Sequence, residues 1–218
     1  MARLLSPILS LQNFLILLLV AFLSSCSGTH ERKVLVFFQA EGEQTPAGIN
    51  VIQQMGGQAG FAVDTSSQVT SIAEENLQNY SAVVFLGVAV DSLNVHQQTD
   101  FERFVQAGGG YVDVNSTIKT KYNWPWYEEL MAETAKTEVQ NPEYQEMPVQ
   151  LMSAKEGQAP EGINVWSGGY DGGQAFYISG QNVSTDLSDA QVKEYLQKGI
   201  AYAIGDNTLD YDLSRSPR

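Results

Sequence analysis

The 218-residue sequence is poor in cysteine and histidine, with one Cys and two His. An intramolecular disulfide is excluded because it needs two thiols, so an apolar core must stabilise the fold. Basic residues are also scarce, since 12 Lys and Arg stand against 25 Asp and Glu and give a formal net charge of −13. This charge argues against nucleic acid as a partner, because binding to phosphates depends on protein cations.

The sequence has no apolar run long enough for a transmembrane helix, which needs roughly 20 residues. The apolar run at residues 14–23 follows Arg3 and precedes two serines, which is the architecture of a signal peptide. The order Leu-Ser-Ser-Cys that ends at Cys26 resembles the bacterial lipobox, whose cysteine is acylated and becomes the mature N-terminus. The alternative is an ordinary cleaved signal that leaves a free thiol. We predict a signal peptide at 1–25 and a lipidated tether at 26–32, with the acyl chains of Cys26 in the lipid bilayer.

Residues 33–205 show strands alternating with helices, a pattern typical of a parallel sheet covered on both faces. The first half predicts strands at 34–38, 61–63, 82–90 and 111–114, and helices at 46–55, 71–77 and 97–107. The second half predicts helices at 124–131 and 189–204, a strand at 174–179, and short strands at 149–152 and 163–166. We expect the helix after Pro46 to break at Gly56, a turn at 168–173, and a disordered tail at 206–218. One domain of this length can bury a sufficient core.

Six segments resemble the ThuA-like (trehalose-utilisation) family. Three of them are specific: FERFVQAGGGYV at 101–112, WPWY at 124–127 and YDGGQAFY at 170–177. The other three are KVLVFFQAEG at 33–42, PAGINVIQQMG at 46–56 and AVVFLG at 82–87. The resemblance implies a three-layer α/β sandwich with a mostly parallel sheet, similar to flavodoxin and to class I glutamine amidotransferases. It also implies a connection with trehalose or keto-sugar metabolism.

The sequence departs from the family at the positions where histidines are expected. The loop after the first strand has Glu41, Gly42 and Glu43 in place of a histidine-bearing run, Asn115 stands where another histidine is usual, and Gln181 stands where a third is usual. The chain's own histidines, His30 and His96, lie elsewhere. The segment between the WPWY and YDGG motifs is also shorter than is usual in the family. These departures argue against an intact active site.

Polar side chains follow the predicted strands at the carboxyl edge of the sheet, where ligands bind in open α/β folds. Amide, hydroxyl and carboxylate groups next to indoles suit a sugar, because the polar groups can pair with hydroxyls while the rings stack on C–H faces. Packing in the core is the alternative role of the two tryptophans. The candidate ligand-binding residues are Glu41, Glu43, Gln44, Asp91, Asn115, Ser116, Trp124, Trp126 and Gln181.

The remaining chemistry is limited. The predicted domain holds no cysteine for nucleophilic catalysis, and the two glutamates at 41 and 43 are more typical of a solvated loop than of a tuned acid–base pair. We expect no metal site and no cofactor. The sequence therefore predicts a non-catalytic lipoprotein that binds a carbohydrate or a protein partner at the cell envelope, on the periplasmic side of the outer membrane. One alternative is a residual enzyme of carbohydrate metabolism that uses Glu41, Glu43 and Asn115, and another is a purely structural component of the envelope.

Overall fold

The computed structural model describes residues 32–39, 45–116, 124–136, 163–180, 183–184, 186–206 and 208–214. Residues Arg32–Arg218 form one compact unit. Within the described ranges, no helix has both the length and the apolar character needed to cross a bilayer. Several sequence predictions lie outside these ranges: the signal peptide, Cys26, Glu41, Glu43, Gln44, Gln181 and the strand at 149–152.

The centre of the fold is a six-stranded sheet with the order β2-β1-β3-β4-β6-β5. Its strands are β1 (Lys33–Phe38), β2 (Ala62–Ser66), β3 (Ala82–Leu86), β4 (Gly110–Val114), β5 (Asn164–Tyr170) and β6 (Gly173–Ser179). Five strands are parallel, and the edge strand β5 runs antiparallel to β6. The expected mostly parallel α/β sheet is confirmed.

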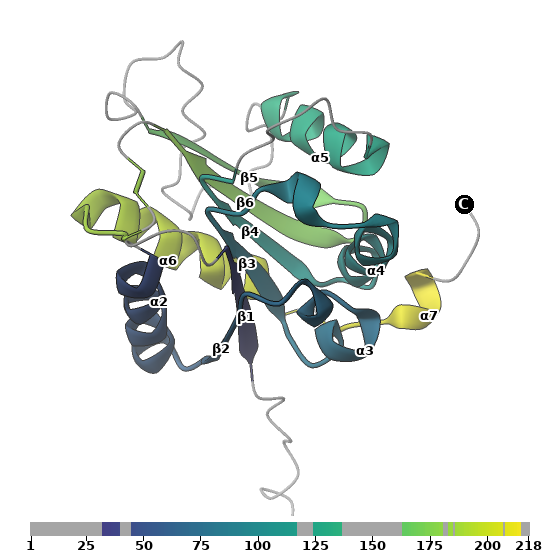
Figure 1. Cartoon of the computed structure of the whole chain (residues 1–218), viewed down its shortest axis with the longest axis horizontal. Coiled ribbons are helices and arrows are strands. Elements are labelled where there is room, and N and C mark those ends of the chain that lie inside the picture. The colour runs from purple at the N-terminus through teal and green to yellow at the C-terminus, as the bar shows by residue number, and fades with distance from the viewer. Residues whose placement is uncertain are drawn as a thin grey trace, which may run out of the picture. The chain divides into compact units, whose positions relative to one another are not determined.

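Helices cover both faces of the sheet, which makes three layers (Figure 1). One face packs against α2 (Thr45–Ala59) and α6 (Ala190–Ile204), and the other packs against α3 (Glu74–Leu77), α4 (Val95–Gln106) and α5 (Pro125–Lys136). Short 3-10 turns, η1 (Val69–Ser71) and η2 (Val90–Ser92), lie in the connections on either side of β3. A last short helix, α7 (Tyr211–Ser214), packs beside α4.

Strand β1 shows why its apolar run is continuous rather than alternating. Val34 and Val36 belong to the core on the α2–α6 side, whereas Leu35 and Phe37 belong to the core on the other side. All four side chains are at most 1% exposed. Successive residues of a strand point to opposite faces, so a strand with helices on both sides must be apolar at every position.

Among the boundaries that differ from those that the sequence predicts, two show how tertiary packing sets the end of an element. Helix α2 does not break at Gly56 but continues to Ala59. Gly56 is buried, and a Cβ at this position would lie 2.6 Å from the Phe61 carbonyl oxygen. That glycine permits close packing and does not end the helix. Strand β3 ends at Leu86, four residues earlier than predicted, and Gly87 with φ 62° turns the chain into η2.

The prediction of a disordered tail is wrong for residues 208–214. The Asp210 N–H donates to the Ala107 carbonyl over 2.8 Å, and Leu209 packs against the apolar core on the α4 side. The four-residue helix α7 follows. The polar composition of this segment did not reveal the docking, because the contacts are made with α4 and the core, which lie far away in the sequence.

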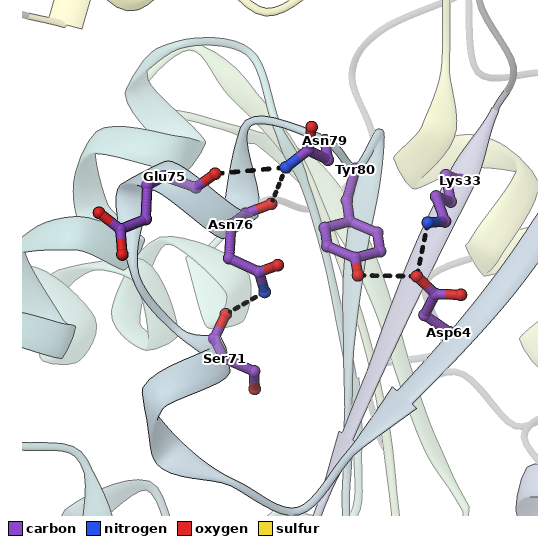
Figure 2. A network of polar contacts seen from close by, with 7 residues as sticks. All are labelled: Lys33, Asp64, Ser71, Glu75, Asn76, Asn79 and Tyr80. Atoms are coloured by element: carbon purple, nitrogen blue, oxygen red, sulfur yellow. Dashed lines mark hydrogen bonds and ion pairs between the residues drawn. The ribbon is translucent and has the colours of Figure 1, made fainter.

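A polar network lies near the start of β1 and β3 (Figure 2). Figure 2 shows Lys33 and Tyr80 both pointing at Asp64: Lys33 Nζ lies 2.6 Å from Asp64 Oδ2, and the Tyr80 hydroxyl donates to the same oxygen over 2.9 Å. The hydrogen bond from Lys33 lowers the pKa of Asp64. Burial, together with the Asp64 carboxylate, raises the pKa of Tyr80 to about 12. The network links β1, β2 and the loop before β3, where Tyr80 lies.

We expect Tyr80 to titrate at about 12 and Asp64→Asn to move its pKa down toward 10. The amide carries no charge to oppose the tyrosinate, so part of the shift should disappear. Because the pKa of Tyr80 is higher in the fold than in the unfolded chain, its contribution to stability is present below about pH 10 and is lost as the pH rises through 12. An alkaline absorbance titration of the protein minus that of Tyr80→Phe isolates this one hydroxyl. An unchanged difference curve in Asp64→Asn would contradict the prediction.

Candidate functional site

The carboxyl edge of the sheet contains a topological switch point between β1 and β3. The chain leaves β1 toward β2 on one side, and β3, β4 and β6 follow on the other side, so the loops after β1 and β3 diverge. Crevices of this kind bind ligands in open α/β folds. In the described residues, Gln39 borders it after β1, and Gly87 to Asp91 border it after β3. Asp91 lies in η2 and is partly exposed.

Asn115 follows β4 at the same edge and adopts a left-handed conformation with φ 53°. Its side-chain amide spans to the loop after β6: Nδ2 donates to the Val183 carbonyl over 3.0 Å, and the Gly180 N–H points at Oδ1 over 3.5 Å. Asparagine tolerates this backbone region better than most residues do. Asn115 therefore fastens the loop after β4 to the loop after β6.

We expect Asn115→Ala to lower the free energy of unfolding by about 2 kcal/mol, because alanine loses the Val183 hydrogen bond and is strained at positive φ. Asn115→Gly removes the same side chain without the strain and should cost about 1 kcal/mol or less. Urea denaturation of the two variants separates the backbone effect from the side-chain effect. Equal losses in both would show that backbone conformation is not a factor at this position.

Asp113 is the one fully buried carboxyl group among the described residues, with 0% exposure. Its Oδ2 accepts hydrogen bonds from the hydroxyls of Tyr111, over 2.5 Å, and of Tyr127, over 3.2 Å. Its Oδ1 accepts from the Ser116 N–H over 2.9 Å. Both tyrosines are 2% exposed. The carboxyl group thus joins β4, helix α5 and the loop after β4 at one point.

Burial raises the pKa of Asp113, while the hydrogen bonds from Tyr111, Ser116 and Tyr127 oppose that rise. The same burial, with the nearby carboxylate, raises the pKa values of Tyr111 and Tyr127 well above the usual value. The two tyrosines therefore remain hydroxyl donors at neutral pH. The three side chains are at most 2% exposed, so the cluster is not an acid–base site open to solvent. Its hydrogen bonds instead hold β4, α5 and the loop after β4 together.

The tryptophans of the WPWY motif lie in an aromatic layer beneath α5. Trp124 is 2% exposed, stacks on Tyr127 at 5.2 Å between ring centroids, and donates from Nε1 to Glu102 over 2.5 Å. Trp126 donates from Nε1 to Asp171 over 2.8 Å. The two tryptophans thus make packing contacts, the role that the sequence offered as the alternative to sugar binding.

Asp171 connects all three specific motifs of the sequence. It lies in the turn of the β5–β6 hairpin with φ 50°, and its Oδ2 accepts from both Trp126 and Gln106 over 2.8 Å. The Tyr170 hydroxyl also donates to the Trp126 carbonyl over 3.2 Å. The hairpin expected at 168–173 is present, but its turn is only Asp171 and Gly172, because β5 extends to Tyr170 and β6 begins at Gly173. The motif residues Gln106, Trp126, Tyr170 and Asp171 therefore fix the hairpin against α4 and α5.

The structure adds Tyr111, Asp113 and Tyr127 to the residues that the sequence picked out. The available signal was Asp113 itself, a carboxylate inside a strand that is otherwise apolar and glycine-rich. Its burial could not be deduced without knowing that α5 covers that face. Among the described residues, no group of three His, Cys, Asp or Glu is placed to hold a metal ion. One cleft among the described residues is lined by Ala73, Glu74, Glu75, Gln78 and Asp100. None of the candidate ligand-binding residues lines this cleft.

The strand order, with its switch point between β1 and β3, defines a doubly wound, flavodoxin-like α/β protein. The model of the ThuA family, described as trehalose utilisation, matches residues 33–164, and the chain belongs to that family. The match ends as β5 begins, so the YDGG hairpin lies beyond it.

Two solved structures are similar to this chain. A putative ThuA-like protein from Bacteroides uniformis ATCC 8492 superposes with a TM-score of 0.56 at 13% identity, over 81% of this chain and 92% of that one. A cytoplasmic protein from Salmonella typhimurium LT2 superposes with a TM-score of 0.45 at 12% identity, over 77% and 95% of the two chains. The first likeness supports the fold. No curated protein matches the sequence.

Proposed function

We propose that this ThuA-family protein is a lipid-anchored, non-catalytic protein of the cell envelope that binds a carbohydrate at the carboxyl edge of its sheet. The observation that carries the proposal is the role of Asn115. A side-chain amide does not ionise near neutral pH and so cannot act as a general acid or base, and here it is engaged with the Val183 carbonyl. A family site that has lost its histidine to a positioning residue suits binding better than proton transfer.

The groups near that edge suit a neutral, hydroxyl-rich ligand. Gln39 offers an amide, and Asp91 offers a carboxylate that can accept hydrogen bonds from sugar hydroxyls. The net charge of −13 makes an anionic ligand a poor match. A carbohydrate is therefore favoured over a phosphate-bearing ligand.

A thermal-shift screen of residues 27–218 against mono- and disaccharides and keto-sugars tests the proposal. A sugar at 100 times its dissociation constant adds about 2.7 kcal/mol of stability, a shift of several degrees. We expect the shift to shrink in Asp91→Asn and in Asn115→Gly. It should persist in Asp64→Asn, whose side chain lies in the network near the start of β1 and β3. A panel without any shift would overturn carbohydrate binding and leave a protein partner as the function to pursue.

Turnover of a bound sugar would overturn the non-catalytic assignment. If that turnover is lost in Glu41→Gln or Glu43→Gln, the protein is a residual enzyme.

The anchoring part of the proposal predicts that Cys26→Ala moves the protein from the membrane fraction to the soluble fraction and abolishes palmitate incorporation. Acyl chains are the expected attachment because the acidic surface is repelled by anionic lipid. Fractionation of bacterial cells and metabolic labelling measure the two outcomes. Ser27→Ala is the matched control, since it changes the neighbouring residue and keeps the thiol. Labelling that survives in Cys26→Ala would disprove the lipobox assignment.

A further inference from the structure

We infer that the Asp113 carboxyl group is a pH-sensitive clasp on the loop after β4, holding residues 115–116 in place when ionised and loosening them when protonated. Because those residues border the proposed ligand site, the clasp would make ligand binding depend on pH. That last step rests on the proposed function, whereas the clasp itself rests on the geometry around Asp113.

The clasp is a short bridge from a rigid strand to the turn that follows it. Asp113 lies in β4 between β3 and β6, and its Oδ1 accepts the Ser116 N–H three residues along the chain. Asn115, between them, sits at φ 53° and binds the loop after β6 through its side chain. One carboxyl oxygen therefore restrains a strained turn that is linked to a second loop.

The donors around Asp113 suit a carboxylate. Tyr111, Tyr127 and the Ser116 N–H all direct hydrogens at its two oxygens. The Ser116 hydroxyl, although without a partner of ordinary geometry, is close enough to favour the charged form of Asp113. Charge-assisted hydrogen bonds are roughly twice as strong as neutral ones. The ionised clasp is therefore the tight one.

Protonation adds one solvent proton to a carboxyl oxygen and breaks no covalent bond. The charge that strengthened the Ser116 N–H bond disappears, and the new O–H must find an acceptor among the Tyr111, Tyr127 and Ser116 oxygens. The Tyr111 and Tyr127 hydroxyls already lie 3.3 Å apart, so they can reorient to accept it. The turn therefore loses the charge-assisted hydrogen bond at Ser116, while the strand remains in the sheet.

The surroundings of Asp113 make this change accessible to pH. Burial raises the pKa of Asp113 above the usual value of a carboxyl group. The titratable groups that face it are Tyr111 on its own strand, Tyr127 on α5 and Tyr177 on β6, all neutral at these pH values. Phe85 from β3 and Phe101 from α4 pack on the Tyr111 ring and bring no charge. No described Lys or Arg pairs with Asp113, so the charge at this position is set by its own proton.

Hydrogen–deuterium exchange of the acylated protein in neutral detergent micelles, followed by mass spectrometry between about pH 4 and pH 8, tests the clasp. After correction for intrinsic exchange, we expect protection of the segment around Ser116 to fall about tenfold on acidification, the change for one charge-assisted hydrogen bond. Asp113→Asn should show the low protection at every pH. Tyr127→Phe removes a donor to the carboxylate and should move the midpoint to higher pH. Asp64→Asn should leave the midpoint unchanged.

Flat protection in the wild-type protein, or the same pH profile in Asp113→Asn, would overturn the inference. If Asp113→Asn does not fold, an unmoved midpoint in Tyr127→Phe overturns it instead. Sugar affinity measured at the two ends of the pH range separates the two proposals. If no sugar binds but protection of the Ser116 segment depends on pH, the proposed ligand is rejected and the clasp stands. Sugar binding without any pH effect on the segment rejects the clasp and keeps the ligand.

Discussion

Gly110→Ala is expected to lower the free energy of unfolding by about 3 kcal/mol. Gly110 begins β4 against the last turn of α6, and a Cβ there would lie 2.1 Å from the Ala203 carbonyl oxygen and 2.6 Å from its carbon. Both are backbone atoms, so no side chain can rotate out of the way. Either β4 or α6 must shift, and overpacking of this kind costs about 1–3 kcal/mol.

Gly57→Ala provides the matched control. Gly57 lies inside α2, and a Cβ there meets nothing within 4 Å. Alanine in an exposed helix interior is more favourable than glycine by about 0.5–1 kcal/mol, so this variant should gain stability. Urea denaturation followed by far-UV circular dichroism gives both values. A Gly110→Ala variant as stable as the wild-type protein would disprove the close approach of β4 and α6.

Asp113→Ala is expected to cost about 3 kcal/mol or more. The substitution leaves the Tyr111 and Tyr127 hydroxyls and the Ser116 N–H without their common acceptor in a buried site. Each unsatisfied buried donor costs about 1–3 kcal/mol, although the two tyrosines can partly satisfy each other. Asp113→Asn retains one acceptor oxygen and should cost less.

Asp64→Ala is the control for this second prediction. Asp64 also accepts a hydrogen bond from a tyrosine hydroxyl and forms an ion pair with Lys33. Its side chain is 44% exposed, so in the alanine variant water can bind the groups that lose the carboxylate. Exposed pairs of this kind contribute about 1 kcal/mol or less. Thermal unfolding of the two alanine variants at neutral pH compares them directly. Equal losses would show that burial does not set the value of the Asp113 cluster.

The motifs that carry the family resemblance have a structural function in this chain. Gln106, Trp126 and Asp171 come from three separate motifs and meet in one hydrogen-bonded group, while Glu102 binds Trp124 nearby. Residues that look specific in a sequence are often taken as active-site residues. Here they position α5, and α5 in turn places Tyr127 over Asp113.

The sequence by itself determined the layered α/β fold and most of its elements. Continuous apolar runs such as 34–37 and 82–86 are buried on both faces, and a chain that alternates such strands with helices has few other ways to cover them. The β5–β6 turn was also predictable, because Asp171-Gly172 supplies the two positive φ angles that it uses. These features depend on local preferences and on the burial pattern along the chain.

Only the tertiary structure decided which polar residues meet. Asp113 and Tyr127 are fourteen residues apart, and Asn115 and Val183 are sixty-eight apart, so no local pattern relates them. The same reason explains the unforeseen continuation of α2 through Gly56 and the docking of Leu209, since each depends on a surface supplied by another part of the chain. The burial of a strand can be deduced from its composition. The partner of a buried polar group depends on how the helices pack on the sheet.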